Sequence, residues 1–182
     1  MVLEIVQYGD PALRKVGKKV SAITTEIKKL VDAMLDAMHA ANGVGLAAQQ
    51  VGQALQLAVI EIPAEIERPS KMWIDSKEVD LQAYMPLILI NPEVVLTKKK
   101  DSDSEGCLSF PGLSVEINRA YRVSVTTTNL QGERWSFDAA GLLGRAVQHE
   151  VDHLNGVLFI DRLNKKDREL LKEELEEMRA KS

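Results

Sequence analysis

The sequence has few of the residues on which several protein classes depend. Its 182 residues include one cysteine and three histidines. A single cysteine cannot form an internal disulfide, so a disulfide scaffold is excluded. No stretch approaches the roughly 18 apolar residues that a membrane span needs. Basic residues are outnumbered, with 23 Lys and Arg against 27 Asp and Glu, which argues against direct nucleic-acid binding through a basic surface.

The first residues and the length narrow the class further. The start, Met1-Val2-Leu3-Glu4, lacks the basic region and the long apolar region of a signal peptide. We therefore expect a cytoplasmic protein, because a lone thiol persists in a reducing compartment. A chain of 182 residues suits a single domain spanning 1–182.

The spacing of apolar residues predicts three helices. The first covers 24–42, and the second covers 138–154 with Asp138 as its N-cap. The second helix is apolar over so wide an arc that we expect it to be buried. The third occupies 165–182, with Lys and Glu pairs on its outer face.

Short segments rich in Val, Ile, Leu and Thr predict β-strands. They cover 57–62, 87–90, 93–96, 113–117, 122–128, 134–137 and 157–160. Most of these strands follow one another without intervening helices, so antiparallel pairing is expected. The predicted class is therefore α+β, with antiparallel sheets.

Two segments are predicted to be loops. The segment 63–86 contains three prolines and no sustained apolar period. A loop insertion of this length is uncommon in a compact domain, and two interpretations stay open: a mobile lid that borders the substrate cleft, or a surface insertion. The charged segment 98–104 is predicted to be a solvated turn.

The strongest local signal is the run His149-Glu150-Val151-Asp152-His153 within the second predicted helix. Residues four apart share a helix face, so both imidazoles can bind one metal ion. Glu150 lies beside them and can reach the water of such a site without being a ligand. Two unrelated polar residues on a helix are the alternative, which the scarcity of histidine disfavours.

A catalytic metal site needs a third protein ligand and an open position. Cys107 lies in the segment EGCLSFPG at 105–112, and a thiolate with two imidazoles suits Zn²⁺, Fe²⁺ or Co²⁺. A lone cysteine is often only a small buried apolar residue, but the flanking Gly and Pro favour a ligand. His39, at the margin of the first helix's apolar stripe, is expected to be partly exposed and not a ligand.

A glycine-containing segment, GVGLAAQQVG at 43–52, follows the first helix directly. It differs from a dinucleotide fingerprint because it follows a helix and has the wrong glycine spacing. Small residues allow close approach of the backbone. We expect a tight loop that presents backbone N–H groups and one amide side chain near an active site.

Together these segments resemble the three motifs of the peptide deformylases, metalloenzymes that remove the formyl group from the N-terminal methionine of new bacterial polypeptides. The matching segments are GVGLAAQQ at 43–50, EGCLS at 105–109 and HEVDH at 149–153. The similarity extends from the N-terminus to about residue 164. It implies the peptide deformylase fold, in which antiparallel sheets pack around a central buried helix that carries the His-Glu motif, with N- and C-terminal helices.

The resemblance also implies a role for each matching residue. The metal ligands would be Cys107, His149 and His153, and Glu150 would be the general base and acid. The oxyanion would be held by the Gln50 side-chain amide and the Leu108 backbone N–H. Substrate-binding roles would fall to Val44, Gly45 and Gly106, which align the substrate as an added strand, and to Leu142 and Ala146, which line the methionine pocket. Fe²⁺ is implied as the native ion, with Zn²⁺, Ni²⁺ or Co²⁺ able to replace it, and the partner is a formyl-Met nascent polypeptide near the ribosome.

Other functions stay open as alternatives. A zincin-type metalloprotease shares the His-Glu helix, but it needs a third ligand beyond His153, where the sequence has no further histidine. A module that only binds formylated termini would be expected to lack Glu150 or a ligand. A structural metal site would want a fourth protein ligand. Arg145, one turn before His149, either supports the site or is solvated.

Overall fold

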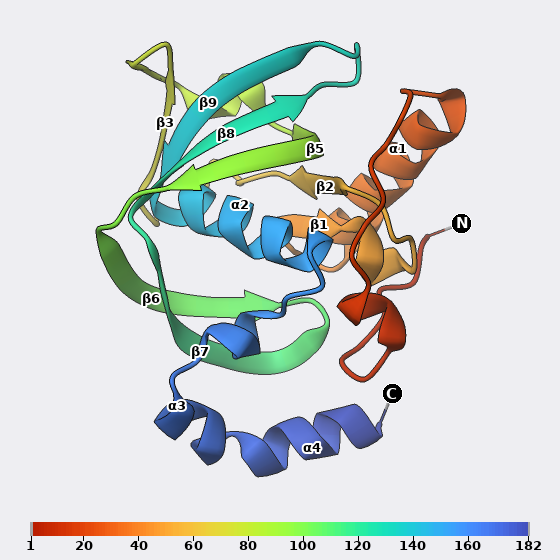
Figure 1. Cartoon of the computed structure of the whole chain (residues 1–182), viewed down its shortest axis with the longest axis vertical. Helices are drawn as coiled ribbons and strands as arrows, with labels where there is room; N and C mark the ends of the chain where they lie inside the picture. The colour runs from red at the N-terminus through yellow and green to blue at the C-terminus, as the bar shows by residue number, and fades with distance from the viewer. Residues whose placement is uncertain (1, 182) are drawn as a thin grey trace.

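The computed structural model describes residues 2–181 as an α+β fold (Figure 1). The strands within this range are β1 (Gly45–Ala47), β2 (Leu57–Ile60), β3 (Ser70–Ile74), β4 (Lys77–Val79), β5 (Leu87–Leu96), β6 (Lys100–Cys107), β7 (Phe110–Ala120), β8 (Arg122–Thr128) and β9 (Arg134–Ala140). The helices are α1 (Thr25–Ala40), α2 (Gly141–Leu154), α3 (Lys165–Leu170) and α4 (Lys172–Ala180), with short 3-10 turns at Pro11–Arg14, Ala48–Val51, Leu81–Tyr84 and Phe159–Arg162.

The strands form two antiparallel sheets. The larger has the order β1-β2-β5-β8-β9-β3-β4, and the smaller pairs β6 with β7. Helix α2 crosses between the two sheets, and every residue from Leu142 to Leu154 is buried (Figure 1). The predicted class, with antiparallel sheets around a central buried helix, is confirmed.

The larger sheet is covered on both faces where β2 lies, which explains the apolar sequence of that strand. In β2 all four residues are buried: Ala58 and Ile60 pack in the cluster that includes α2, whereas Leu57 and Val59 pack in the cluster that includes α1. Successive side chains of a strand point to opposite faces. A strand between two apolar layers therefore needs an unbroken apolar run.

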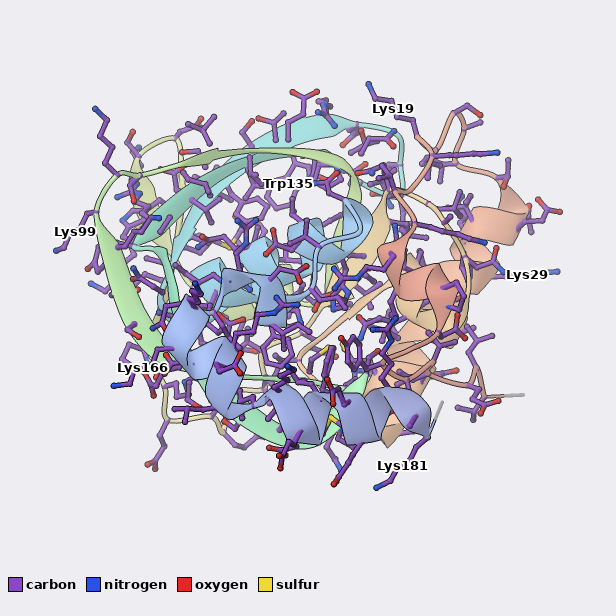
Figure 2. The ribbon with its side chains drawn as sticks, turned by 60° about the horizontal axis from the view of Figure 1, so that its bottom comes forward. Lys19, Lys29, Lys99, Trp135, Lys166 and Lys181 are labelled. Carbon is purple, nitrogen blue, oxygen red and sulfur yellow. The ribbon has the colours of Figure 1, made fainter. Side chains whose placement is uncertain are left out.

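Long charged side chains lie on the outside of the molecule. Lys19, Lys29, Lys99, Lys166 and Lys181 are exposed and are spread around its perimeter (Figure 2). Within residues 2–181, no helix is long and apolar enough to cross a membrane.

Helix α1 begins where the sequence predicts. The Thr24 side chain accepts a hydrogen bond from the backbone N–H of Ile27 at 3.2 Å, and this satisfies one of the free donors of the first turn. The third predicted helix also forms, but it is divided at Leu171 into α3 and α4, and residue 182 lies outside the described range.

The start of α2 was predicted wrongly. Asp138 is not its N-cap but a residue of β9, where it pairs with Arg122. The helix begins at Gly141, and its first donors are satisfied from a distant segment. The N–H of Leu142 donates to the Pro69 carbonyl at 2.8 Å, and the N–H of Leu143 donates to Ser70 Oγ at 2.8 Å.

Three further segments differ from the prediction. The predicted loop 63–86 contains the hairpin β3–β4, and β3 pairs with β9 at the end of the larger sheet. The predicted turn 98–104 is largely strand β6, whose charged side chains are mostly exposed. The predicted strand 157–160 is absent from the described fold, where a 3-10 turn at Phe159–Arg162 takes its place. Its apolar residues pack against Phe110 and Leu175, so burial explains their composition.

Strand β5 joins two segments that were predicted as separate strands. It runs through Leu87–Leu96, with a break in register between Ile90 and Glu93. Asn91, within the break, has a positive φ of 50°, a conformation that Asn tolerates better than most residues.

Gly141 provides a test of the non-local start of α2. Its φ is +66°, and a Cβ atom there would overlap the Pro69 carbonyl. We expect Gly141→Ala to lower the free energy of unfolding by about 3 kcal/mol or more, measured by urea denaturation. Gly132→Ala is the control, because its φ is +81° but a Cβ atom would meet nothing within 4 Å. It should lose about 1–2 kcal/mol from the backbone conformation alone, and equal losses in both variants would contradict the role of Pro69.

Candidate active site

Three potential metal ligands converge in the centre of the molecule. His149 and His153 lie one turn apart on α2, and Cys107 is the last residue of β6. The Nε2 atoms of the two histidines are 3.2 Å apart, and Cys107 Sγ is 3.5 Å from His153 Nε2. All three ligand atoms lie within 4.8 Å of one another.

These separations fit one metal ion. With metal–nitrogen bonds near 2.0 Å and a metal–sulfur bond near 2.3 Å, neighbouring ligand atoms of a tetrahedral site are roughly 3.3–3.7 Å apart. Burial lowers the pKa of His153 well below its usual range, so its ring is neutral, as ligation requires. His39 is not in this group; its side chain is 54% exposed and pairs with Glu61.

Glu150 lies beside the histidines and is available for proton transfer. Its side chain is buried, and Oε2 has no hydrogen-bond partner among the described residues. Burial raises the pKa of Glu150 to about 7, since a low-dielectric environment disfavours the charged form. Gly45 makes this placement possible, because any Cβ atom there would collide with the Glu150 carboxylate.

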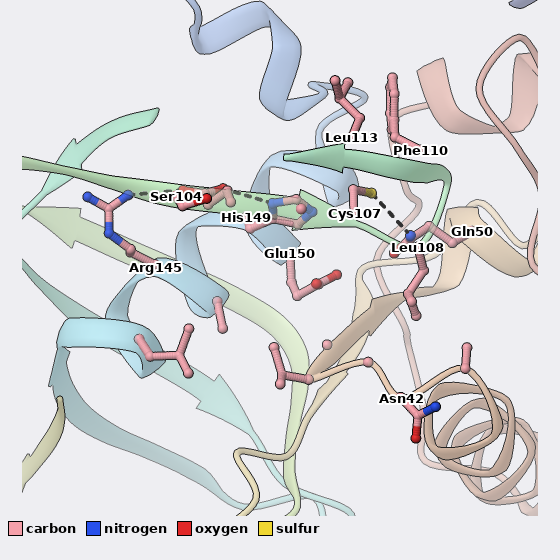
Figure 3. A pocket seen from close by; sticks show the side chains of 18 of the residues that line it. Asn42, Gln50, Ser104, Cys107, Leu108, Phe110, Leu113, Arg145, His149 and Glu150 are labelled. Carbon is pink, nitrogen blue, oxygen red and sulfur yellow. Dashed lines mark hydrogen bonds and ion pairs between the residues drawn. The ribbon is translucent and has the colours of Figure 1, made fainter. Parts of the chain in front are cut away.

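Gln50 presents its amide to the same centre. Its carbonyl oxygen Oε1 accepts a hydrogen bond from the backbone N–H of Ala47 at 2.9 Å, which fixes the orientation of the amide. Its Nε2 group then faces Ser109 Oγ at 3.1 Å and Cys107 Sγ at 3.7 Å. Figure 3 shows Gln50 and Glu150 reaching the site from different elements, with Leu108 next to Gln50.

A cavity of about 600 Å³ opens onto these groups. Its lining includes ten of the eleven site residues that the sequence predicts: Val44, Gly45, Gln50, Gly106, Cys107, Leu108, Leu142, Ala146, His149 and Glu150. His153 is the exception; it is 1% exposed and does not line the cavity. Three segments that lie far apart in the sequence therefore form one site.

The structure adds a buried ionic network that the sequence analysis missed. Glu105 Oε1 lies 3.0 Å from His149 Nδ1, which leaves the Nε2 atom of that ring to face the other ligands. Arg119 holds Glu105 through two hydrogen bonds of 2.7 and 2.8 Å and donates a third to Asp152 at 2.7 Å. Although burial acts in the opposite direction, the hydrogen bonds from Arg119 and His149 lower the pKa of Glu105 to about 2.

Arg145 belongs to the same network and is not solvated. Its guanidinium is buried and donates to Glu105 at 3.2 Å, to the Ile117 carbonyl at 2.8 Å and to the Asp101 carbonyl at 2.8 Å. It therefore connects α2 to both strands of the smaller sheet. Glu105 could have been suspected from its place in the EGCLS segment, but nothing near Arg119 in the sequence marks it as a partner.

Arg119 provides a test of this network. We expect Arg119→Met to lower the free energy of unfolding by about 3 kcal/mol, because it leaves two buried carboxylates short of a cation. The matched variant is Arg134→Met, whose side chain is 39% exposed and pairs with an exposed Glu93. An exposed pair contributes about 1 kcal/mol or less. Urea denaturation of both variants measures the difference, and similar losses would show that the buried network does not stabilise the fold.

Comparisons with known proteins agree with this site. A family model described as polypeptide deformylase matches residues 2–169. The peptide deformylase of Methylacidiphilum infernorum is 46% identical over 179 residues, which cover 98% of this chain and 94% of that protein. The crystal structure of peptide deformylase from Thermotoga maritima aligns with a TM-score of 0.77 at 36% identity, covering 90% of this chain and 99% of that one. A Synechococcus elongatus peptide deformylase in complex with actinonin aligns with a TM-score of 0.80 at 36% identity, covering 97% and 85%.

These findings decide between the alternatives. A zincin-type protease would take its third ligand from beyond His153, whereas here the third candidate ligand, Cys107, precedes the helix. The relatives that match nearly the whole chain are named peptide deformylases. The chain belongs to the peptide deformylase family, whose members are metal-dependent hydrolases.

Proposed function

We propose that this deformylase removes the formyl group of formyl-Met nascent polypeptides with Glu150 as its general base and acid and with a metal ion held by Cys107, His149 and His153. The observation that carries the proposal is the meeting of three ligand atoms with a buried, unpartnered carboxylate in one cavity. Glu150 is thereby available for proton transfer, and the three ligands leave a coordination position open.

The donor set limits the choice of ion. One thiolate and two imidazoles suit Fe²⁺, Zn²⁺, Ni²⁺ or Co²⁺ and disfavour Mg²⁺ or Ca²⁺, which prefer oxygen ligands. We propose Fe²⁺ as the native ion on the family resemblance. A divalent ion held by Cys107, His149 and His153 would supply Lewis acidity, which would activate water for attack on the formyl group.

Glu150 handles the proton in both halves of the reaction. It accepts a proton from the attacking water and passes it to the nitrogen of the breaking amide bond, releasing formate and a free amino terminus. A pKa of about 7 suits both tasks near neutral pH, because neither accepting nor donating the proton is then strongly unfavourable.

Gln50 and the backbone N–H of Leu108 are assigned to the oxyanion. Gln50 is buried and its amide orientation is fixed from the carbonyl side, so its N–H group is oriented before the reaction begins. A donor of this kind stabilises the transition state by about 3 kcal/mol. Leu108 directly follows Cys107 and lines the same cavity, which supports the assignment of its N–H to the oxyanion.

The peptide is assigned to the rims of the cavity. The peptide backbone would pair, as an added strand, with Val44 and Gly45 at the start of β1 and with Gly106 of β6. Leu142 and Ala146, on successive turns of α2, would line the pocket for the methionine side chain. Backbone pairing places few demands on the following residues, so one enzyme can accept many nascent chains.

The substrate indicates where in the cell the reaction takes place. A formylated terminus exists on newly made chains, so we propose that the enzyme acts in the cytoplasm near the ribosome. A reducing compartment also keeps Cys107 available as a thiolate ligand.

Replacement of Glu150 tests its assigned role. We expect Glu150→Ala to retain its metal while kcat for formate release from a formyl-Met peptide falls by at least about 100-fold. Glu116→Ala is the control, because Glu116 is exposed on β7 and should leave both quantities unchanged. Full activity in Glu150→Ala would show that another group transfers the proton.

Metal analysis tests the ligands and the ion together. Protein purified anaerobically should contain roughly one Fe²⁺ per chain, as expected for a single three-ligand site. We expect His153→Ala to lose this iron, whereas His39→Ala keeps it, because His39 is exposed and lies outside the cluster. Equal iron in both variants would contradict the ligand assignment, and zinc in place of iron in the anaerobic protein would contradict the choice of ion.

A further inference from the structure

Two residues of the segment 63–86, Pro69 and Ser70, contact the start of the helix that carries the histidines. The Pro69 carbonyl and Ser70 Oγ accept hydrogen bonds from the first N–H groups of α2, at Leu142 and Leu143, each at 2.8 Å. Arg68 directly precedes Pro69, and it lines the same cavity as Leu142, which is one of the residues assigned to the methionine pocket.

Arg68 also reaches the opposite wall of the cavity. Its Nη2 atom donates to Asp103 Oδ2 at 2.8 Å and to the Ser104 carbonyl at 3.2 Å, both on β6. Arg68, Ser104 and Leu142 all line the same cavity. The Arg68 side chain thus reaches β6 from the segment that is hydrogen-bonded to the start of α2.

The position of this span is set by the two elements that it joins. Leu142 is seven residues before His149 on α2, or roughly 10 Å along a helix. Ser104 is three residues before Cys107 on β6, which is also roughly 10 Å along a strand. Arg68, which is bonded to Ser104, therefore lines the cavity at the end away from the candidate ligands.

The ion pair between Arg68 and Asp103 also affects where the rest of the Arg68 side chain lies. Asp103 is 54% exposed and Arg68 is 39% exposed, so their ion pair lies at the surface, although Arg68 also lines the cavity. A long basic side chain can keep its charge in water while its aliphatic stem covers apolar surface. An ion pair this exposed contributes little to stability. The pairing therefore matters for the direction in which the Arg68 side chain lies, and little for the stability of the fold.

We propose that Arg68 determines specificity by closing the far end of the side-chain pocket, which limits the length of the first residue that the enzyme accepts. This inference rests on the proposed assignment of Leu142 and Ala146 to that pocket. A side chain as long as that of methionine fits between the reacting carbonyl and the stem, whereas a longer one meets it.

Kinetics with two formylated peptides test the proposal. One begins with norleucine, which has the length of methionine, and the other with 2-aminooctanoic acid, which is two methylenes longer. We expect Arg68→Ala to reduce the preference in kcat/KM for the shorter peptide by about tenfold, as for a contact with one or two methylenes. Arg68→Met, which keeps an apolar stem, should reduce it less. Lys71→Ala is the control, because Lys71 is exposed on β3, three residues after Arg68, and pairs only with Glu78 among the ion pairs of the described residues.

A pocket variant separates this inference from the proposed function. Ala146→Leu narrows the assigned pocket and should lower kcat/KM for the norleucine peptide. If it does so while Arg68→Ala keeps the wild-type preference, Arg68 does not close the pocket and the inference is overturned. If Ala146→Leu leaves both peptides unaffected, the assignment of the pocket itself is wrong. Urea denaturation of each variant checks that the fold is intact.

Discussion

The arrangement of the site depends on the contacts of the buried Glu105 carboxylate. It joins β6 to β7 through Arg119 and joins both to α2 through His149. Cys107 is only two residues further along β6, so the same contact positions the thiol relative to the imidazoles. A buried charge is unfavourable unless it is paired and hydrogen-bonded, and here each oxygen of Glu105 has two partners or more within the described network.

The central helix places polar groups in the interior, and the surrounding charges are matched to them. Asp152 accepts hydrogen bonds from Arg119 and from Arg162, and Gln148 pairs with the backbone of Ala120 in both directions. Glu150 differs from these groups because Oε2 has no partner within the described residues. Polar groups that are satisfied hold the frame in place, whereas Glu150 Oε2, like His153 Nδ1 on the same helix, has no partner among the described residues and lies at the candidate site.

The segment 63–86 shows how one stretch of chain serves both fold and site. As β3 it extends the larger sheet beyond β9, and as Pro69 and Ser70 it satisfies the first donors of α2. The prolines and charged residues of this segment give no strand pattern in the sequence, because hairpin strands at the edge of a sheet need no long apolar run. The same argument applies to β6, whose charged residues predict a turn although they form a strand at the surface.

The sequence by itself determined the elements and the chemistry that local spacing encodes. A period of 3.6 residues identified α1 and α2, an i, i+4 pair of histidines pointed to one side of a candidate metal site, and three short motifs identified the family. Only the tertiary structure decided which distant groups satisfy one another: Pro69 and Ser70 at the start of α2, and Arg119 on Glu105. The physical reason is that a helix or strand pattern depends on near neighbours, whereas burying a charge or a free N–H group depends on partners that the fold brings from anywhere in the chain.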